Sequence, residues 1–380
     1  MTMGKIGFTA GQWGQVRQDY GRWWAGELDR PLIAVTLTGG LANQREPVLP
    51  HKDFAAWYDL AVPAEAIVER WDYELSQKRF LGDAFPGVWP NFGPGVIAAF
   101  LGCKVVNSET AGTTWFEPEK PVTLESLEFR YDAGNVWFRR VGEIMRAAVE
   151  RWQGTVQVGM TDLGGNLDVL SSFVPGEPLL FALCDQPEPV KALTWKVHEL
   201  WARYFEELNA IVSPVNPGYT AWTEILSPEP YYILQCDFAY MIGPDMFEEF
   251  VLPELQATCK RLANPFFHLD GPGMLTHLDA LLAIPELKGI QWVPGVGAKP
   301  MDEWVDVYRR IRAAGKLMQV LNYDSDWDLA AERFNRIVAG LGGDARGIYW
   351  SATTSVSQED KVRTFLDTYG VDSDKGLAGV

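Results

Sequence analysis

The chain contains few of the residues that bind soft metals or form disulfide bonds. Among its 380 residues there are four histidines and four cysteines. Cys103, Cys184, Cys236 and Cys259 include no CxxC pair, and their spacing matches neither a disulfide framework nor a zinc finger. We therefore expect reduced thiols that are mostly buried.

Long hydrophobic runs are also absent. The sequence has no stretch of about 18 or more apolar residues, as a membrane-spanning helix would require. No apolar signal-peptide core precedes Trp13. These two features predict a cytoplasmic protein without a membrane partner.

Basic residues are scarce relative to acidic ones. Lysine and arginine total 33 against 50 aspartates and glutamates, which gives a net charge of −17. A surface of this charge repels phosphate backbones and anionic lipids, so nucleic acids and membranes are excluded as expected partners. A polyanionic substrate is disfavoured for the same reason.

What the chain does have is a recurrent pattern of apolar runs that are followed by amphipathic stretches. We predict buried strands at Pro31–Gly40, Thr155–Gly165, Asn264–Gly271, Leu287–Gly295, Gly315–Asp324 and Arg346–Thr354. We predict helices over Met246–Leu262, Gly273–Leu287 and Met301–Gly315, because apolar residues recur there every three or four positions.

The spacing of the later strands indicates repeated βα units. Phe266, Gln291, Met318 and Ile348 lie 25, 27 and 30 residues apart in turn. This rhythm favours a single (β/α)8 barrel over residues 1–380, with residues 41–114, rich in Trp, Pro and Gly, as an insertion near the barrel mouth. No GxGxxG motif or P-loop follows a strand, which weakens the alternative of a doubly wound nucleotide-binding sheet.

In a barrel of this kind the active site lies where the strands end, and polar residues gather there in the sequence. The candidate catalytic residues are Asp162, Glu224, Asp237, His268 and Asp270. The candidate substrate-binding residues are Asn91, Trp222, Gln291, Trp292, Asn322, Tyr349 and Trp350. Several carboxylates beside one histidine suit acid/base chemistry or a hard divalent metal, with His268, Asp270 and Glu224 as the expected ligands.

Simpler roles remain open for most of these residues. Asp162 and the nearby Asp168 could cap a helix, and Glu224 could be part of a loop surface. Gln291 and Trp292 could complete the core. His268 could orient a loop by a hydrogen bond, although its position between an apolar run and a Gly-Pro-Gly turn favours a functional role.

Four segments, taken in order, resemble the uroporphyrinogen decarboxylase family in the broad sense. They are "LGGNLDVLSSFVPGEPLLFALCDQPEPVKAL", "QCDFAYMIGPDMFEEFVLPEL", "FFHLDGPG" and "GIYWSATTSVSQEDKVRTF". The resemblance runs from about Asn91 to the C-terminus. That family includes corrinoid-dependent methyltransferases and is related to cobalamin-independent methionine synthase. The resemblance implies a (β/α)8 barrel and an enzyme that acts on a small organic molecule, with a corrinoid protein as a possible partner.

The chain departs from the family at the residues that carry its chemistry. The decarboxylases have an arginine-rich clamp, whereas the matching region here offers only Arg22 and Arg30. The methyltransferases have a His-x-Cys pair and a further cysteine near the last strand, and these bind zinc. Here the pair reads His268-Leu269-Asp270, and the last strand has no cysteine. A zinc-thiolate site is therefore not supported.

Three functions follow from these observations. The first is methyl transfer of the corrinoid type without the usual thiolates, and with a divalent metal as the possible cofactor. The second is a glycoside hydrolase-like enzyme that uses paired carboxylates in a tryptophan-lined cleft. The third is a barrel that binds a ligand without catalysis. The sequence leaves the substrate, the oligomeric state and the paired carboxylates undetermined.

Overall fold

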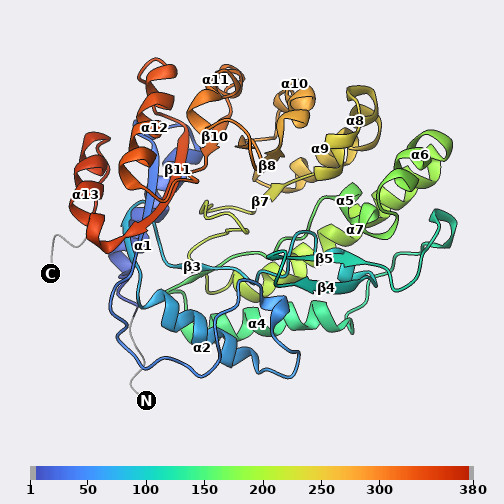
Figure 1. Cartoon of the computed structure of the whole chain (residues 1–380), viewed down its shortest axis with the longest axis horizontal. Coiled ribbons are helices and arrows are strands. Elements are labelled where there is room, and N and C mark those ends of the chain that lie inside the picture. The colour runs from blue at the N-terminus through green and yellow to red at the C-terminus, as the bar shows by residue number, and fades with distance from the viewer. Residues whose placement is uncertain (1–5, 376–380) are drawn as a thin grey trace.

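The computed structural model describes residues 6–375 and shows a mixed α/β fold built on a mostly parallel central sheet (Figure 1). The strands are β1 (Leu32–Thr38), β2 (Arg79–Gly82), β3 (Gly87–Val88), β4 (Lys104–Ser108), β5 (Thr113–Glu117), β6 (Gln157–Val158), β7 (Tyr231–Leu234), β8 (Asn264–Asp270), β9 (Gly289–Val293), β10 (Leu317–Val320) and β11 (Ile348–Ser355). The main sheet has the order β2-β1-β11-β10-β9-β8-β7, and only the β1–β2 pair is antiparallel.

Two smaller sheets complete the strand arrangement. β3 pairs with β6 in parallel, and β4 forms an antiparallel hairpin with β5. Residues 41–114, expected as an insertion, thus contain β2 at the edge of the main sheet and β3 in a parallel pair. This segment contributes parallel structure as well as the irregular loops that its composition predicts.

Helices connect the parallel strands and cover the outer side of the main sheet. The α-helices are α1 (Ala10–Trp24), α2 (Ala64–Leu75), α3 (Ile97–Phe100), α4 (Val136–Trp152), α5 (Asn166–Phe173), α6 (Glu177–Asp185), α7 (Pro187–Val212), α8 (Pro244–Phe250), α9 (Leu252–Arg261), α10 (Leu278–Leu282), α11 (Val305–Ala313), α12 (Trp327–Gly340) and α13 (Glu359–Thr368). The 3-10 helices are η1 (Ala55–Trp57), η2 (Leu124–Ser126), η3 (Asp237–Met241), η4 (Pro272–His277), η5 (Met301–Glu303) and η6 (Val356–Gln358). Figure 1 shows α8 to α13 in an arc around β7 to β11.

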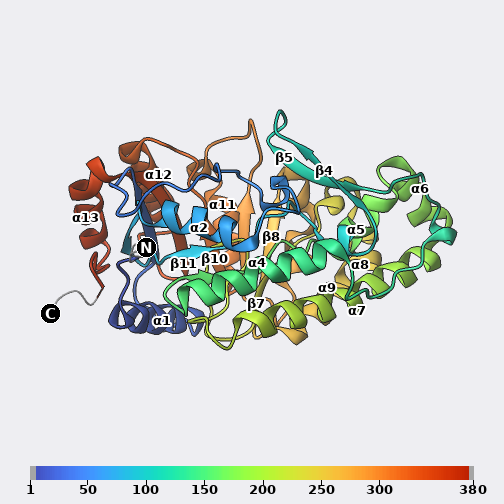
Figure 2. The same cartoon turned by 90° about the horizontal axis from the view of Figure 1, so that it is seen from below.

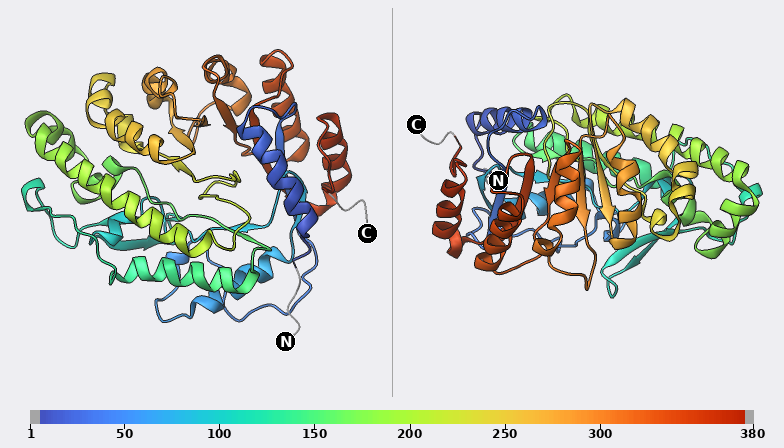
Figure 3. Two further views of the ribbon diagram at one scale, coloured as in Figure 1. Left: turned by 180° about the vertical axis from the view of Figure 1, so that it is seen from behind. Right: turned by 90° about the horizontal axis from the view of Figure 1, so that it is seen from above.

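The long helices α4 and α7 pack side by side below the smaller sheets, as Figure 2 shows from below. Figure 3 shows the same pair from behind and α1 crossing near β1. Within residues 6–375 no single helix is long and apolar enough to cross a membrane. The bent pair α5 and α6 passes that test of length and composition only when the two helices are taken together.

The predicted strands are present at all six positions, but the predicted helix over Met246–Leu262 is two helices. The chain breaks at Val251, between α8 and α9, and Pro253 lies in the first turn of α9. Proline has no backbone N–H to donate within a helix, so it is tolerated at a helix start and interrupts a continuous helix.

Candidate functional site

Strand β8 presents the residues of the "FFHLDGPG" motif to two different sides. Leu269 is fully buried, whereas His268 and Asp270 are partly accessible. Side chains alternate along a strand, so His268 and Asp270 share the face opposite to Leu269. At Gly271 the chain adopts a φ of 86°, and a Cβ atom there would lie 2.9 Å from the Tyr240 ring. Glycine is required at this turn because an L side chain is strained and crowded there.

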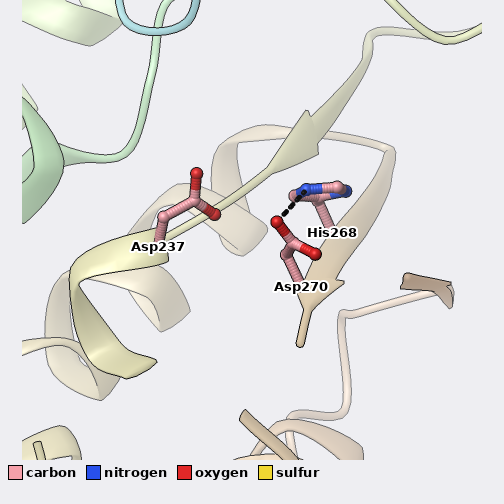
Figure 4. Close-up of side chains that lie close together, drawn as sticks. All are labelled: Asp237, His268 and Asp270. Carbon is pink, nitrogen blue, oxygen red and sulfur yellow. Dashed lines mark ion pairs between the residues drawn. The ribbon is translucent and has the colours of Figure 1, made fainter. Parts of the chain in front are cut away.

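Asp237 approaches these two residues from the neighbouring strand connection. It begins η3, directly after β7, and Figure 4 shows it beside Asp270 and His268. Donor atoms of Asp237, His268 and Asp270 all lie within 4.8 Å of one another. His268 Nε2 lies 4.0 Å from Asp270 Oδ2. Two carboxylates and one imidazole at this separation form a candidate site for a divalent ion.

A second aspartate holds Asp237 in place. The carboxylate of Asp168, in the first turn of α5, accepts hydrogen bonds from the backbone N–H groups of Asp237 at 3.0 Å and Phe238 at 2.8 Å. Asp168 therefore does cap a helix, as one reading of the sequence allowed, but the helix is η3 and not its own. No motif or spacing in the sequence indicates this contact, which spans 69 residues.

Hydrogen bonds across three adjacent strands fix the imidazole of His268. His268 Nδ1 bonds to Gln291 Oε1, and Gln291 Nε2 donates to Gln319 Oε1 at 2.8 Å. The three residues face one another in the strand register. Because an amide oxygen only accepts, Nδ1 carries the proton and Nε2 keeps its lone pair for the carboxylate side. Gln319 was absent from the sequence prediction, although it is the polar residue at the matching position of β10.

Electrostatics at this site are dominated by carboxylates. Burial, reinforced by Asp237, raises the pKa of Asp162 to about 7, and the same two causes raise the pKa of Asp168 to about 7. Asp237 is exposed at the edge of a recess, where partial burial and then Asp270 raise its pKa to about 6. Burial lowers the pKa of His268 and outweighs the opposing effects of Gln291 and Asp270. A neutral histidine beside acidic groups is the form that binds metal.

An open cavity adjoins Asp237. Its volume is about 310 Å³, and its lining includes Asp168, Ser171, Gln235, Asp237 and Met241. Its lining contains no lysine or arginine. The cavity therefore offers room for a small neutral or cationic molecule next to the candidate ligands.

Glu224 lies apart from the predicted metal ligands. It is not a member of the group formed by Asp237, His268 and Asp270. Instead it lines a separate cavity of about 230 Å³ with Asn91 and Lys78, and burial raises its pKa. The third place in the predicted His268, Asp270 and Glu224 set is thus taken by Asp237, because β7 and β8 are neighbours.

Two of the predicted pocket tryptophans belong to the core. Trp292 packs on Trp304, and Trp350 packs on Trp327 and Phe334 from α12. Both are at least 98% buried. They alternate with Gln291 and Tyr349 along their strands, so they point to the covering helices and not to the site. This corrects the prediction that they shape the pocket.

The remaining predicted residues have defined partners. Trp222 packs edge-on against His268 with ring centroids 5.1 Å apart, which agrees with a place in the site. The Tyr349 hydroxyl donates to the Glu224 carbonyl at 3.0 Å. Asn91 and Asn322 each accept a backbone N–H two residues further on and thus stabilise loops. Asp162 accepts from Gly164 at 2.9 Å.

Comparison of the chain with models of known protein families gives no match. Comparison with curated proteins likewise gives none.

Proposed function

We propose that this chain is an enzyme that binds a divalent metal ion through Asp237, His268 and Asp270 and acts on a small organic substrate in the adjoining cavity. The observation that carries this proposal is the convergence of the three donor groups within 4.8 Å. The neutral imidazole, with Nε2 left free by Gln291, supports the same conclusion.

A barrel architecture would explain why these groups converge. In the proposed barrel the strands follow the order β1, β2, β3, β6, β7, β8, β9, β10 and β11, with β2 antiparallel to β1. The parallel pairing of β11 with β1 and of β3 with β6 supports this arrangement. The carboxyl ends of the strands would then surround one mouth, where barrel enzymes place their catalytic groups.

The donor set fits a hard or borderline ion and does not fit a zinc-thiolate centre. Cys236 precedes Asp237 in the sequence, but it is 1% exposed and burial raises its pKa, so it remains a thiol. Carboxylate and imidazole donors suit magnesium, manganese or non-thiolate zinc. Such an ion supplies Lewis acidity toward an oxygen of the substrate.

The residues of the chain have separate roles in this proposal. Asp168 positions Asp237 through the two backbone N–H groups that it accepts. Gln291 orients His268. Asp162, whose pKa is raised to about 7, would exchange a proton near neutral pH. The reaction class remains the one implied by the resemblance to the uroporphyrinogen decarboxylase family, namely methyl transfer with a corrinoid carrier.

The carbohydrate alternative loses part of its support. It required tryptophan faces around paired carboxylates, and Trp292 and Trp350 lie in the core. Trp222 alone of the three predicted tryptophans contacts the acidic site through His268. The raised pKa values of Asp162 and Asp168, which burial and Asp237 cause, favour an enzyme over a ligand-binding barrel without catalysis.

Metal binding is tested first by titrating the purified, metal-free protein with manganese, zinc and magnesium in a calorimeter. We expect one site in the wild type and its loss in Asp237→Asn and His268→Ala. Asp245→Asn is the matched control, because Asp245 is exposed on α8 and outside the ligand group. Equal binding by all four proteins would contradict the proposed site.

Methyl transfer is tested separately. The metal-loaded protein is incubated with cob(I)alamin and a panel of methoxy compounds and methylated amines, and the absorption spectrum of methylcobalamin is followed. The methyl group moves to cobalt, and the leaving group takes a proton. If the spectrum stays unchanged with every compound while metal binding is intact, the proposal of methyl transfer is contradicted and the proposal of the metal site still stands.

A further inference from the structure

A small cavity lies between the start of α5, the end of β7 and α9. Its volume is about 10 Å³, the size of one water molecule or ion. Asn166 at the start of α5, Gln235 after β7 and Glu254 in the first turn of α9 supply polar groups to its lining. Each of these three side chains is at least 94% buried.

Two oxygens at this cavity have no hydrogen-bond partner. Asn166 Oδ1 and Gln235 Oε1 are both fully enclosed and unpaired. Leaving a buried acceptor unsatisfied destabilises a protein by roughly the desolvation of that group, so native structures supply a partner. Both unpaired atoms are acceptors, which indicates an occupant that donates hydrogen bonds or carries a positive charge.

Glu254 adds a carboxylate whose neighbours are an amide and a histidine. Its Oε2 accepts from Asn166 Nδ2 at 2.5 Å, and His198 Nδ1 lies 3.7 Å from the same oxygen. Among the ion pairs of residues 6–375, none joins Glu254 to a lysine or arginine. Burial raises the pKa of Glu254. A buried carboxylate is stabilised in its charged form by a nearby cation.

We propose that this cavity binds one monovalent metal cation, sodium or potassium, through Asn166 Oδ1, Gln235 Oε1 and the Glu254 carboxylate. A single carboxylate balances a single positive charge. A divalent ion would leave one positive charge unbalanced at this single carboxylate. The amide and carboxylate oxygens are the hard ligands that such an ion prefers.

The position of the cavity links it to the candidate site. Gln235 lies two residues before Asp237, and it lines both the small cavity and the open cavity beside Asp237. A Cβ atom on Gly165 would lie 2.1 Å from the Gln235 carbonyl oxygen, so the start of α5 and the end of β7 are in close contact. A cation bound there thus links the two segments that carry Asp168 and Asp237, and stabilises their contact.

Thermal unfolding in three chloride salts tests this proposal. The melting temperature is measured at equal ionic strength in sodium, potassium and tetramethylammonium chloride, with chelator present to remove divalent ions. We expect a melting temperature about 2 °C higher in sodium or potassium, with a rise that follows cation concentration. Equal values in the three salts would overturn the proposal and indicate a bound water only.

Variants at the cavity test whether the difference in melting temperature between salts arises there. Glu254→Gln keeps the side-chain shape and is expected to abolish the difference between salts, and Gln235→Met is a second variant should the first fail to fold. Glu248→Gln is the matched control, because Glu248 is exposed on α8 and makes the same change of charge. A salt difference that persists in both cavity variants would place the cation elsewhere and contradict this site.

Crystals of the wild type soaked in thallium(I) give an independent readout. We expect an anomalous peak between Asn166, Gln235 and Glu254. A refined water without an anomalous signal would reject the cation. The result does not depend on the divalent site, because the proposed ligands are different residues.

Discussion

Two groups of carboxylates among the described residues differ in how their charge is balanced. Near the start of β1, Asp19 and Asp83 are at most 4% exposed and both bond to Arg30 and Lys375. Asp83 also accepts from the Ile33 N–H at 2.7 Å. We call these four charged residues the paired cluster. Two cations balance two anions there.

The second group lies where the strands end and contains Asp162, Asp168, Asp237 and Asp270 with His268. We call it the acidic cluster. None of its aspartates forms an ion pair with lysine or arginine among residues 6–375. Burial works to raise the pKa of Asp19, but Lys375 and Arg30 outweigh it and lower the value. Burial and the neighbouring aspartates instead raise the pKa of Asp162 and Asp168 to about 7.

We interpret the difference as one between a cluster that stabilises the fold and the site that we propose binds a ligand. A neutralised cluster holds segments together, in this case α1, β1 and the chain near Lys375. An acidic cluster without cations is a source of instability unless a ligand or proton balances it. Proteins place such strain at functional sites.

The largest effect is expected from breaking the paired cluster with Asp83→Asn. The substitution leaves Arg30 and Lys375 with one carboxylate for two buried cations. Removal of one partner from a buried ion pair lowers the free energy of unfolding by about 3–5 kcal/mol. Chemical denaturation of the variant and of the exposed control Asp245→Asn measures this loss. A change below about 1 kcal/mol would show that the cluster does not stabilise the fold.

The acidic cluster is expected to respond in the opposite direction. The folded-state pKa of Asp162 is about 7, whereas an unfolded aspartate titrates near 3.9. The folded state thus binds the proton more tightly, so stability decreases as pH rises from about 4 to 7. Asp162→Asn retains an acceptor for Gly164 but cannot ionise. Between pH 4 and 7 its free energy of unfolding should therefore fall by roughly 2–4 kcal/mol less than that of the wild type. Denaturation at several pH values measures the slope.

The control for this pH series is Asp19→Asn. Asp19 has a lowered pKa in the folded state, so its contribution to stability is present at neutral pH and is lost as pH falls below about 4. The two variants should therefore change the stability profile with opposite sign. Parallel profiles would refute the contrast between the clusters.

Metal affinity is expected to depend on the residue that orients His268. Gln291→Met removes the acceptor of Nδ1 while it keeps a side chain of similar length. Loss of such a supporting hydrogen bond typically weakens metal binding by about 10–100-fold. Calorimetric titration with manganese gives the affinity, and Gln319→Met should give a smaller loss because it acts through Gln291. An unchanged affinity in Gln291→Met would show that His268 is not a ligand.

The sequence predicted the α/β class and the six strand positions because apolar runs and their spacing are local signals. It also singled out His268, Asp270 and Asp237, because each follows or ends a strand; the structure brings them together, and their role stays a prediction. It failed for Trp292 and Trp350, whose side of the strand depends on register. Each lies one residue away from a side chain of the opposite face.

Contacts between segments that are distant in the chain could not be predicted from the sequence. The hydrogen bonds of Asp168 to the start of η3 depend on how α5 packs beside β7. Lys375 reaches Asp19 across 356 positions. No periodicity or spacing in the sequence indicates these two contacts, because each contact depends on the three-dimensional arrangement of the chain.

The smallest effect is expected from Glu224→Gln, which distinguishes the observed ligand group from the one predicted by sequence. Glu224 faces the cavity that contains Lys78 and Asn91, and it is outside the group of Asp237, His268 and Asp270. Because Glu224 is not one of the proposed ligands, manganese affinity should stay within about a factor of two. Asp237→Asn, measured in the same titration, should lose binding. A loss in Glu224→Gln comparable to that in Asp237→Asn would restore Glu224 as a ligand and require a rearrangement of the loop after Trp222.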